Sequence, residues 1–372
     1  ILHRLSQSPP RAPPRGCRVL VLAPTRELAA QIGESFRAYG RHLSITTAVV
    51  FGGASMQRQV HAMARGVDVL VATPGRLMDH VDGHTIQLDG VEALVLDEAD
   101  HMLDIGFIHA LKRIAKLLPK QRQTVLFSAT MPASIEDLAS QFLHDAQRIA
   151  VTPVSSTAER VRQHVIHVNH TDKADVLSDL LGDRALSRGL VFTRTKHGAD
   201  RLKRRLEDHG HRVDVIHGNR SQPQRERALA NFRDGSVRLL IATEIAARGI
   251  DVDGVSHVVN YDLPNVPEQY VHRIGRTARA GESGVAISFC APDERVFLRD
   301  IEKLTQTPVD VMSHKLSLPA PQPGERLPPA LKTGGGGGQR QRPSAPKGKY
   351  GSRAHAGGKP AGHQPGKPGG HA

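Results

Sequence analysis

The chain has 372 residues and a formal net charge of +13, with 50 Lys and Arg against 37 Asp and Glu. Its two cysteines, Cys17 and Cys290, stand far apart, which excludes a disulfide framework and a cysteine zinc cluster and favours a reducing compartment, the cytoplasm. No apolar run reaches the roughly 18 residues of a membrane span, and no secretory signal peptide is visible. The positive charge indicates a polyanionic partner such as nucleic acid.

Apolar runs alternate with helical patterns in the first half of the chain. Buried strands are predicted at 19–23, 67–72, 93–96 and 124–127. Helices are predicted at 25–39, 55–65 and 134–143, the last opened by a capping box of Ser134 and Asp137. Near-continuous apolar strands separated by helices predict a parallel sheet covered on both faces.

The same alternation returns in the second half. Strands are predicted at 161–168, 189–192, 213–216, 237–242 and 257–260. The helix predicted at 196–208 places Ala199, Leu202 and Leu206 on one face. The sequence therefore predicts two α/β domains, residues 1–152 and 161–315, joined by a polar linker at 153–160.

The C-terminal segment differs from both domains in composition. Its final 54 residues, from Pro319, hold 14 Gly, 10 Pro, nine Lys or Arg and one Glu. Such a segment cannot offset its ordering entropy by burial, so residues 316–372 are predicted to be a disordered basic tail. The tail is expected to bind phosphates loosely.

Two carboxylates follow the predicted strand 93–96 directly, in Asp97-Glu98-Ala99-Asp100. They are expected at the C-terminal edge of a parallel sheet, where α/β proteins bind ligands. In nucleotide hydrolases the first such carboxylate holds Mg²⁺ and the second polarises the attacking water. An Asp that merely ends a strand and caps the next helix fits the same pattern, and the motif alone leaves both interpretations open.

Arginines recur at three-residue spacing in 272–279, where they are expected to share one face of a helical turn. Arginines that reach a transferring phosphoryl group stabilise its developing charge. A basic helix that faces solvent or RNA phosphates is the alternative interpretation, and this pattern alone does not exclude it.

Seven motifs in this order and spacing resemble those of DEAD-box RNA helicases, and the resemblance covers about residues 1–310. The motifs are 24–29 (PTRELA), 52–53 (GG), 73–76 (TPGR), 97–100 (DEAD), 128–130 (SAT), 247–251 (ARGID) and 272–279 (HRIGRTAR). Residues 190–198 and 217–222 most resemble the bacterial RhlE-type subgroup. The resemblance implies two tandem RecA-like domains that close over ATP and single-stranded RNA, and an enzyme that couples ATP hydrolysis to local RNA unwinding and RNA–protein remodelling.

The resemblance also implies catalytic roles. Asp97 and Glu98 would hold hydrated Mg²⁺ and activate water, while His272, Arg276 and Arg279 would serve the γ-phosphate of ATP. Three residues would couple the nucleotide state to strand opening through their contacts with one another and with His272. They are Asp100, Ser128 and Thr130. Two residues would meet the nucleotide near its ribose: Gly249 and Asp251.

RNA would be held through its backbone, independently of base sequence, as a single strand or short duplex. The implied contacts are Pro24, Thr25, Arg26, Gly53, Thr73, Gly75 and Arg76 in the first domain and Thr193, Arg225 and Thr243 in the second. Ribosomal or RNA-decay assemblies are the further partners that the family suggests. Each motif residue also has a plain structural interpretation, since Gly53 and Gly75 suit turns and Thr25, Thr73 and Ser128 suit helix caps.

Three departures from the family pattern stand out. Glu244 replaces the usual Asp, which keeps the charge but moves it and is expected to alter interdomain coupling, whereas Ala278 replaces a frequent Gly with little expected effect. A phosphate-binding loop GxxxxGK[ST] and the adenine-reading glutamine motif are absent, and residues 1–5 resemble the helix that follows that loop. We therefore expect an N-terminally truncated chain that hydrolyses ATP barely or not at all by itself and whose first sheet lacks a strand. The alternative is a non-hydrolysing RNA-binding helicase remnant.

Overall fold

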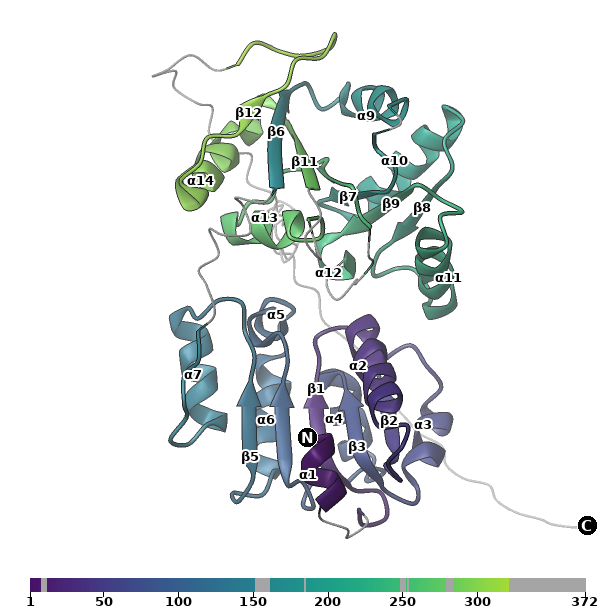
Figure 1. Cartoon of the computed structure of the whole chain (residues 1–372), viewed down its shortest axis with the longest axis vertical. Coiled ribbons are helices and arrows are strands. Elements are labelled where there is room, and N and C mark those ends of the chain that lie inside the picture. The colour runs from purple at the N-terminus through teal and green to yellow at the C-terminus, as the bar shows by residue number, and fades with distance from the viewer. Residues whose placement is uncertain are drawn as a thin grey trace, which may run out of the picture. The chain divides into compact units, whose positions relative to one another are not determined.

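The computed structural model describes residues 1–7, 12–150, 161–183, 185–247, 252, 254–278 and 284–320. It contains two parallel β-sheets, one within residues 1–150 and one within 161–320 (Figure 1). These confirm the predicted fold class, and each part is considered by itself. The linker predicted at 153–160 and most of the predicted tail, from 321 onward, lie outside the described residues. Across the described ranges, no helix is both long and apolar enough to span a membrane.

The first sheet has five parallel strands in the order β2-β3-β1-β4-β5. The strands are β1 (Cys17–Leu22), β2 (Thr47–Val50), β3 (Val67–Ala72), β4 (Ala93–Leu96) and β5 (Gln123–Leu126). The predicted bounds of β3 and β4 are confirmed, whereas β2 was not predicted. The central strand β1 is buried along its whole length, and β5 lies at the edge of the described sheet and is the least buried.

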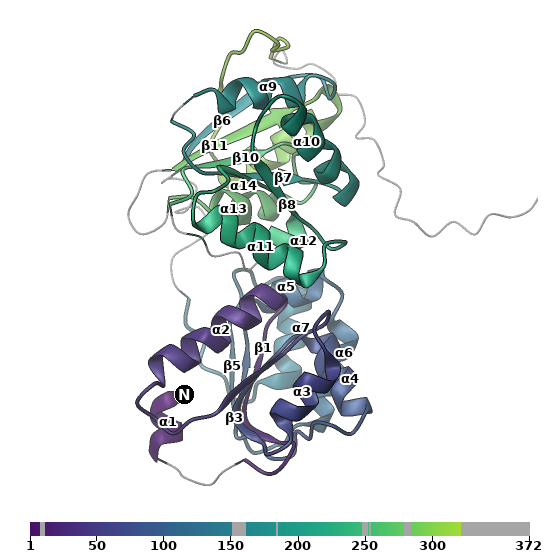
Figure 2. The same cartoon turned by 90° about the vertical axis from the view of Figure 1, so that its right-hand side faces the viewer.

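Alternation along β1 sends side chains to two hydrophobic cores, one on each face of the sheet. Val19 and Val21 pack with residues of the first two helices, while Leu20 and Leu22 pack with residues of α4, α6 and α7. Figure 2 shows α1 and α2 on one side of this sheet and α4 and α6 on the other. The helices are α1 (Leu2–Gln7), α2 (Arg26–Tyr39), α3 (Met56–Met63), α4 (Pro74–Asp82), α5 (Ala99–Asp104), α6 (Ile108–Leu117) and α7 (Ala133–Phe142).

Helix starts are set by local capping. The Thr25 hydroxyl accepts a hydrogen bond from the backbone N–H of Leu28 at 3.3 Å and so caps α2. The predicted capping box at Ser134 is wrong, because α7 already begins at Ala133 with Pro132 as its N-cap. The carbonyl of Pro132 accepts the first helical bonds, which places Ser134 inside the first turn.

The second sheet has seven parallel strands in the order β12-β6-β11-β10-β7-β9-β8. The strands are β6 (Val161–His167), β7 (Gly189–Thr193), β8 (Val213–Ile216), β9 (Leu239–Thr243), β10 (His257–Asn260), β11 (Gly284–Cys290) and β12 (Asp310–Val311). The bounds predicted for β8 and β10 are confirmed, and β9 begins two residues later than predicted. The long strand β11 was not predicted, although it lies between β6 and β10.

Helices α9 to α14 cover this second sheet (Figure 1). They are α9 (Lys173–Leu181), α10 (Lys196–Asp208), α11 (Gln222–Arg233), α12 (Glu244–Ala247), α13 (Pro267–Ile274) and α14 (Arg295–Thr305). The predicted bounds of α10 are confirmed, and its three predicted core residues are buried. Three core clusters of this part hold the helices against the sheet.

The helical face predicted for the arginines of 272–279 is wrong. Helix α13 ends at Ile274, and Arg276 lies beyond Gly275 in a turn. Gly275 closes the helix by donating its backbone N–H to the carbonyl of Val271 at 3.0 Å. Arg279 lies outside the described residues, so its position stays a prediction.

Ala278 follows this turn with a positive φ of 56°. An L-residue in the left-handed region carries a penalty of roughly 1–2 kcal/mol that Gly avoids, offset in part by the greater freedom of Gly in the unfolded chain. Ala at position 278 in place of the family's frequent Gly therefore costs more stability than expected from the sequence.

We expect Ala278→Gly to raise the free energy of unfolding by about 0.5–1 kcal/mol, measured by urea titration. The matched control is Ala228→Gly in the interior of α11, which should lower the free energy of unfolding by about 1 kcal/mol. An unchanged or lower urea midpoint of unfolding for Ala278→Gly would contradict the left-handed backbone conformation of Ala278.

Candidate functional site

The acidic motif begins directly after β4, at the carboxyl edge of the first sheet. Asp97 Oδ1 accepts a hydrogen bond from the backbone N–H of Glu98 at 3.0 Å. Glu98 stands at the N-terminus of α5 with a φ of 50°, a left-handed conformation that a non-Gly residue keeps only when its surroundings enforce it. His101 lies one turn further along α5, and its Nδ1 is 2.7 Å from Glu98 Oε2, which holds the carboxylate in position.

Asp97 is electrostatically suited to a cation. Burial raises the pKa of its carboxyl above the ordinary value, and the neighbouring carboxylate of Glu98 raises it further. A bound cation reverses both effects, because it stabilises the charged form. Asp97, whose pKa is raised, and the adjacent carboxylate of Glu98 are therefore a candidate metal-binding edge.

Asp100 joins the acidic motif to the loop that follows β5. Its Oδ2 accepts two hydrogen bonds from Thr130, from the backbone N–H and from the hydroxyl, each at 3.1 Å. The backbone N–H of Asp100 donates to Ser128 Oγ at 3.2 Å, and Ser128 Oγ donates to the carbonyl of Thr130 at 2.7 Å. The structure thus brings together all three residues predicted for coupling.

An apolar hollow of about 380 Å³ adjoins Asp97 in the first part of the chain. It is lined by Ile1, Val21, Ile32, Phe36, Val95, Asp97 and Phe127. Phe127, which follows the edge strand β5, is 56% exposed. The sheet edge beside Asp97 therefore presents an apolar surface.

Three of the residues predicted to hold RNA lie together at the carboxyl edge of the first sheet. Gly53 has a φ of 81°, and a Cβ atom there would collide with the guanidinium of Arg26. Arg76 Nη1 donates to the carbonyl of Ala54 at 3.0 Å. Gln59 fixes the same loop by donating to the carbonyl of Phe51 at 3.0 Å.

The predicted RNA residues of the second part lie near the ends of its strands. Thr193 ends β7 and is buried, with its hydroxyl donating to the carbonyl of Thr195 at 3.4 Å. Thr243 ends β9, and Arg225 on α11 donates to the carbonyl of His217 at 3.3 Å. Gly249 and Asp251 lie outside the described residues, and their roles stay predictions.

Glu244 makes a specific contact within the second part. Its Oε2 accepts from Arg273 Nε at 2.5 Å, so the longer side chain reaches helix α13. The Arg273 guanidinium also stacks over the ring of Phe192 at 5.0 Å and donates to the carbonyl of Asp262 at 2.8 Å. Glu244, which replaces the usual Asp of the family, therefore links the end of β9 to helix α13, which carries His272.

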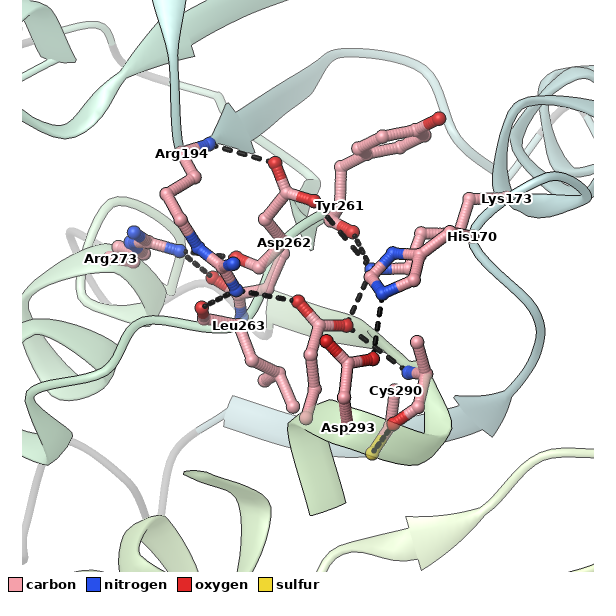
Figure 3. Close-up of polar contacts among 12 residues, drawn as sticks. His170, Lys173, Arg194, Tyr261, Asp262, Leu263, Arg273, Cys290 and Asp293 are labelled. Atoms are coloured by element: carbon pink, nitrogen blue, oxygen red, sulfur yellow. Dashed lines mark hydrogen bonds and ion pairs between the residues drawn. The ribbon is translucent and has the colours of Figure 1, made fainter. Parts of the chain in front are cut away.

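A buried ionic network, which was not predicted from the sequence, lies at the carboxyl edge of the second sheet (Figure 3). Lys173 Nζ donates to Glu294 Oε2 at 2.6 Å and to the carbonyl of Tyr261 at 2.7 Å. Arg194 donates to Glu294 Oε1 at 2.8 Å, and its backbone N–H donates to Asp262 Oδ2 at 2.8 Å. The network fixes the loops after β7 and β10, and only the pairing of residues distant in the sequence reveals it.

We expect Lys173→Met to destabilise the protein by about 3–5 kcal/mol, because it removes one of the positive charges that pair with the fully buried carboxylate of Glu294. The free energy of unfolding from urea titration measures the effect. Lys315→Met is the matched control, since Lys315 is exposed in its ion pair with Asp179 and should cost at most about 1 kcal/mol. Equal effects of the two substitutions would contradict this account of the network.

Two parallel α/β parts, with paired carboxylates at the sheet edge of the first, have the architecture of tandem RecA-like domains. The DEAD/DEAH box helicase model matches residues 1–138, and the helicase conserved C-terminal domain matches residues 172–281. The chain belongs to the DEAD-box helicase family.

Individual relatives agree with this assignment. The ATP-dependent RNA helicase CshA of Listeria monocytogenes is 42% identical over 308 residues, which are 82% of this chain and 58% of that protein. The structure of S. cerevisiae Dbp5 bound to RNA and ADP BeF3 matches with a TM-score of 0.73 and 34% identity, over 81% of this chain and 78% of that one. The DEAD-box helicase Mss116 bound to ssRNA and UDP-BeF matches with a TM-score of 0.70 and 26% identity, over 82% and 66%. The chain thus spans less than two thirds of the CshA relative. The RhlE-type subgroup stays a prediction.

Proposed function

We propose that the protein is a cytoplasmic ATP-dependent RNA helicase that opens short RNA duplexes locally and remodels RNA–protein complexes, including ribosomal or RNA-decay assemblies. The observation that carries the proposal is the hydrogen-bonded cluster of Asp100, Ser128 and Thr130, directly beside the strained Glu98. It links the carboxylates that would act on a nucleotide to a second loop at the same sheet edge. The named activity of the CshA relative and the RNA and nucleotide bound to Dbp5 support the same function.

Each catalytic role follows from what the side chain can do. The carboxylate of Glu98, oriented by His101, would accept a hydrogen bond from the attacking water and polarise it. His272, Arg276 and Arg279 would approach the γ-phosphate and stabilise its developing charge. Two residues would contact the nucleotide near its ribose: Gly249 and Asp251.

The residues present also fit Mg²⁺. The raised pKa of Asp97 marks a carboxylate that a cation would stabilise, and Glu98 adds a second oxygen donor group. Among the described residues, no group of three or more His, Cys, Asp and Glu is arranged to hold a metal ion. Mg²⁺ is commonly held by one or two carboxylates together with water and substrate phosphates. When bound, Mg²⁺ would neutralise phosphate charge.

RNA would bind through its sugar–phosphate backbone at both sheet edges. In the first part, Arg26, Gly53 and Arg76 bring two guanidiniums beside a loop with accessible backbone groups. The remaining proposed contacts are Pro24, Thr25, Thr73, Gly75, Thr193, Arg225 and Thr243. Because these groups contact phosphates and 2′-hydroxyls, binding should be independent of base sequence and sensitive to salt.

The 372 residues contain no GxxxxGK[ST] sequence. We therefore propose that these residues alone bind RNA but hydrolyse ATP barely or not at all, since backbone amides and a lysine normally cradle the phosphates. If the protein that the cell makes bound RNA but did not hydrolyse ATP, it would instead be an RNA-binding helicase remnant.

The RNA interface is tested by Arg76→Ala with fluorescence anisotropy of a labelled single-stranded RNA. We expect weaker binding to RNAs of every base sequence and a salt-dependence slope reduced by about 1. Arg113→Ala is the control, because Arg113 forms an exposed ion pair with Asp82 on α4 and should leave RNA affinity unchanged. An Arg76→Ala protein with the affinity and slope of the wild type would remove this arginine from the interface.

A further inference from the structure

Helix α10 begins three residues after Thr193, the proposed RNA contact at the end of β7. Its cations fall into two groups. Lys203 pairs with Glu207 at 2.5 Å, and Arg205 pairs with Asp175 at 2.8 Å. These positive charges are compensated by carboxylates of the protein itself.

The remaining cations of α10 have no carboxylate partner among the residues that the structure describes. Lys196 donates to the amide oxygen of Asn219 at 3.0 Å, and Arg204 donates to the backbone carbonyl of Asp200 at 3.4 Å. In the described part of the chain, neither these two residues nor Arg201 makes an ion pair with an Asp or Glu. All three residues are exposed.

Two of these residues, Arg201 and Arg204, form a row on the helix with His197, which directly follows Lys196. His197, Arg201 and Arg204 are spaced by four and three residues, and this spacing places them on one face. All three are exposed, and the row is about 10 Å long at 1.5 Å per residue. We call Lys196, His197, Arg201 and Arg204 the α10 basic row.

The start of α10 adds to the positive potential. Thr195 caps the helix by accepting the backbone N–H of Gly198 at 3.0 Å, and the N-terminal end of a helix carries partial positive charge. By contrast Arg194, which precedes the cap, donates to Glu294 at 2.8 Å and so belongs to the buried network. The positive potential available to a ligand therefore starts at Lys196 and follows the helix.

We propose that the α10 basic row is an accessory RNA site, which holds backbone phosphates of the strand that continues beyond the contacts at the end of β7. The inference rests on the proposed RNA function. Exposed cations that the protein leaves without carboxylate partners, in a row that starts beside an RNA contact, complement a polyphosphate chain. At about 10 Å, the row has room for two or three phosphates.

The test compares two double variants that each remove two positive charges from α10. Arg201→Gln/Arg204→Gln changes the basic row, and Lys203→Gln/Arg205→Gln changes the compensated cations. Both are measured with labelled 6-nucleotide and 20-nucleotide single-stranded RNAs across a salt series, after circular dichroism and melting confirm folding.

We expect Arg201→Gln/Arg204→Gln to weaken binding of the 20-nucleotide RNA about tenfold or more and to reduce its salt slope by about 2. Binding of the 6-nucleotide RNA should stay within about twofold, and the control pair should leave both affinities within about twofold. Equal losses of affinity in the two double variants would show that only the net charge of α10 matters, and this would overturn the proposal. Unchanged affinity for the long RNA would also overturn it and leave an acidic protein as the partner to examine. Failure of the wild type to bind either RNA would refute the proposed function itself.

Discussion

Glu98→Gln is expected to lower RNA-stimulated ATP hydrolysis at least 100-fold in the protein as its gene encodes it. The amide keeps the size of the side chain and can still hydrogen-bond His101, but it can neither accept a proton from water nor polarise it as a carboxylate does. The left-handed backbone of Glu98 is retained in the variant, so folding and RNA binding should stay intact. Phosphate release at saturating ATP and RNA measures kcat.

Glu92→Gln is the matched control for this prediction. Glu92 precedes the opposite end of β4 and forms an ion pair with Arg18 at 2.8 Å, so it is far along the strand from the acidic motif. Its replacement should leave kcat within about twofold. If Glu98→Gln retained more than a tenth of the wild-type kcat, Glu98 would have no role in activating water.

Ser128→Ala/Thr130→Val is expected to separate ATP hydrolysis from strand opening. The double substitution removes both hydroxyls from the Asp100 cluster, one of which donates to a charged carboxylate. A hydrogen bond to a charged group contributes about 1.5–3 kcal/mol, which corresponds to roughly a 10- to 100-fold change. We expect unwinding of a short RNA duplex to fall by that factor while ATP hydrolysis stays within a few-fold.

A strand-displacement assay and a phosphate-release assay on the same preparation measure the two activities. Ser140→Ala is the control, because Ser140 on α7 donates to the carbonyl of Asp137 within its own helix, so its loss should change neither activity. A parallel fall of both activities in the double variant would show that the cluster supports hydrolysis itself and does not act in coupling.

The sequence predicted the strands that are mostly apolar, because burial on both faces leaves a pattern that exposed segments rarely share. The bounds of β3, β4, β8 and β10 were predicted in this way, whereas helix α10 was predicted from apolar residues spaced along one helical face. Strand β2 was missed because it is short and only alternately buried. The motifs also located the acidic residues at the correct edge of the sheet.

Other features depend on contacts that a linear pattern does not contain. The network of Lys173, Glu294 and Arg194 joins segments about 100 residues apart and has no local signature. The end of α13 before Arg276 and the positive φ of Ala278 are set by the turn at Gly275, which a three-residue arginine spacing does not indicate. The RNA roles, the domain bounds and the positions of Gly249, Asp251 and Arg279 stay predictions.

Coupling of ATP hydrolysis to RNA binding is tested on the protein itself. ATP hydrolysis by the protein purified in the form its host cell makes is measured with and without single-stranded RNA, beside the Glu98→Gln variant. We expect hydrolysis that rises at least tenfold with RNA and is lost in the variant. RNA binding without ATP hydrolysis in the wild type would contradict the account and identify the protein as an RNA-binding helicase remnant.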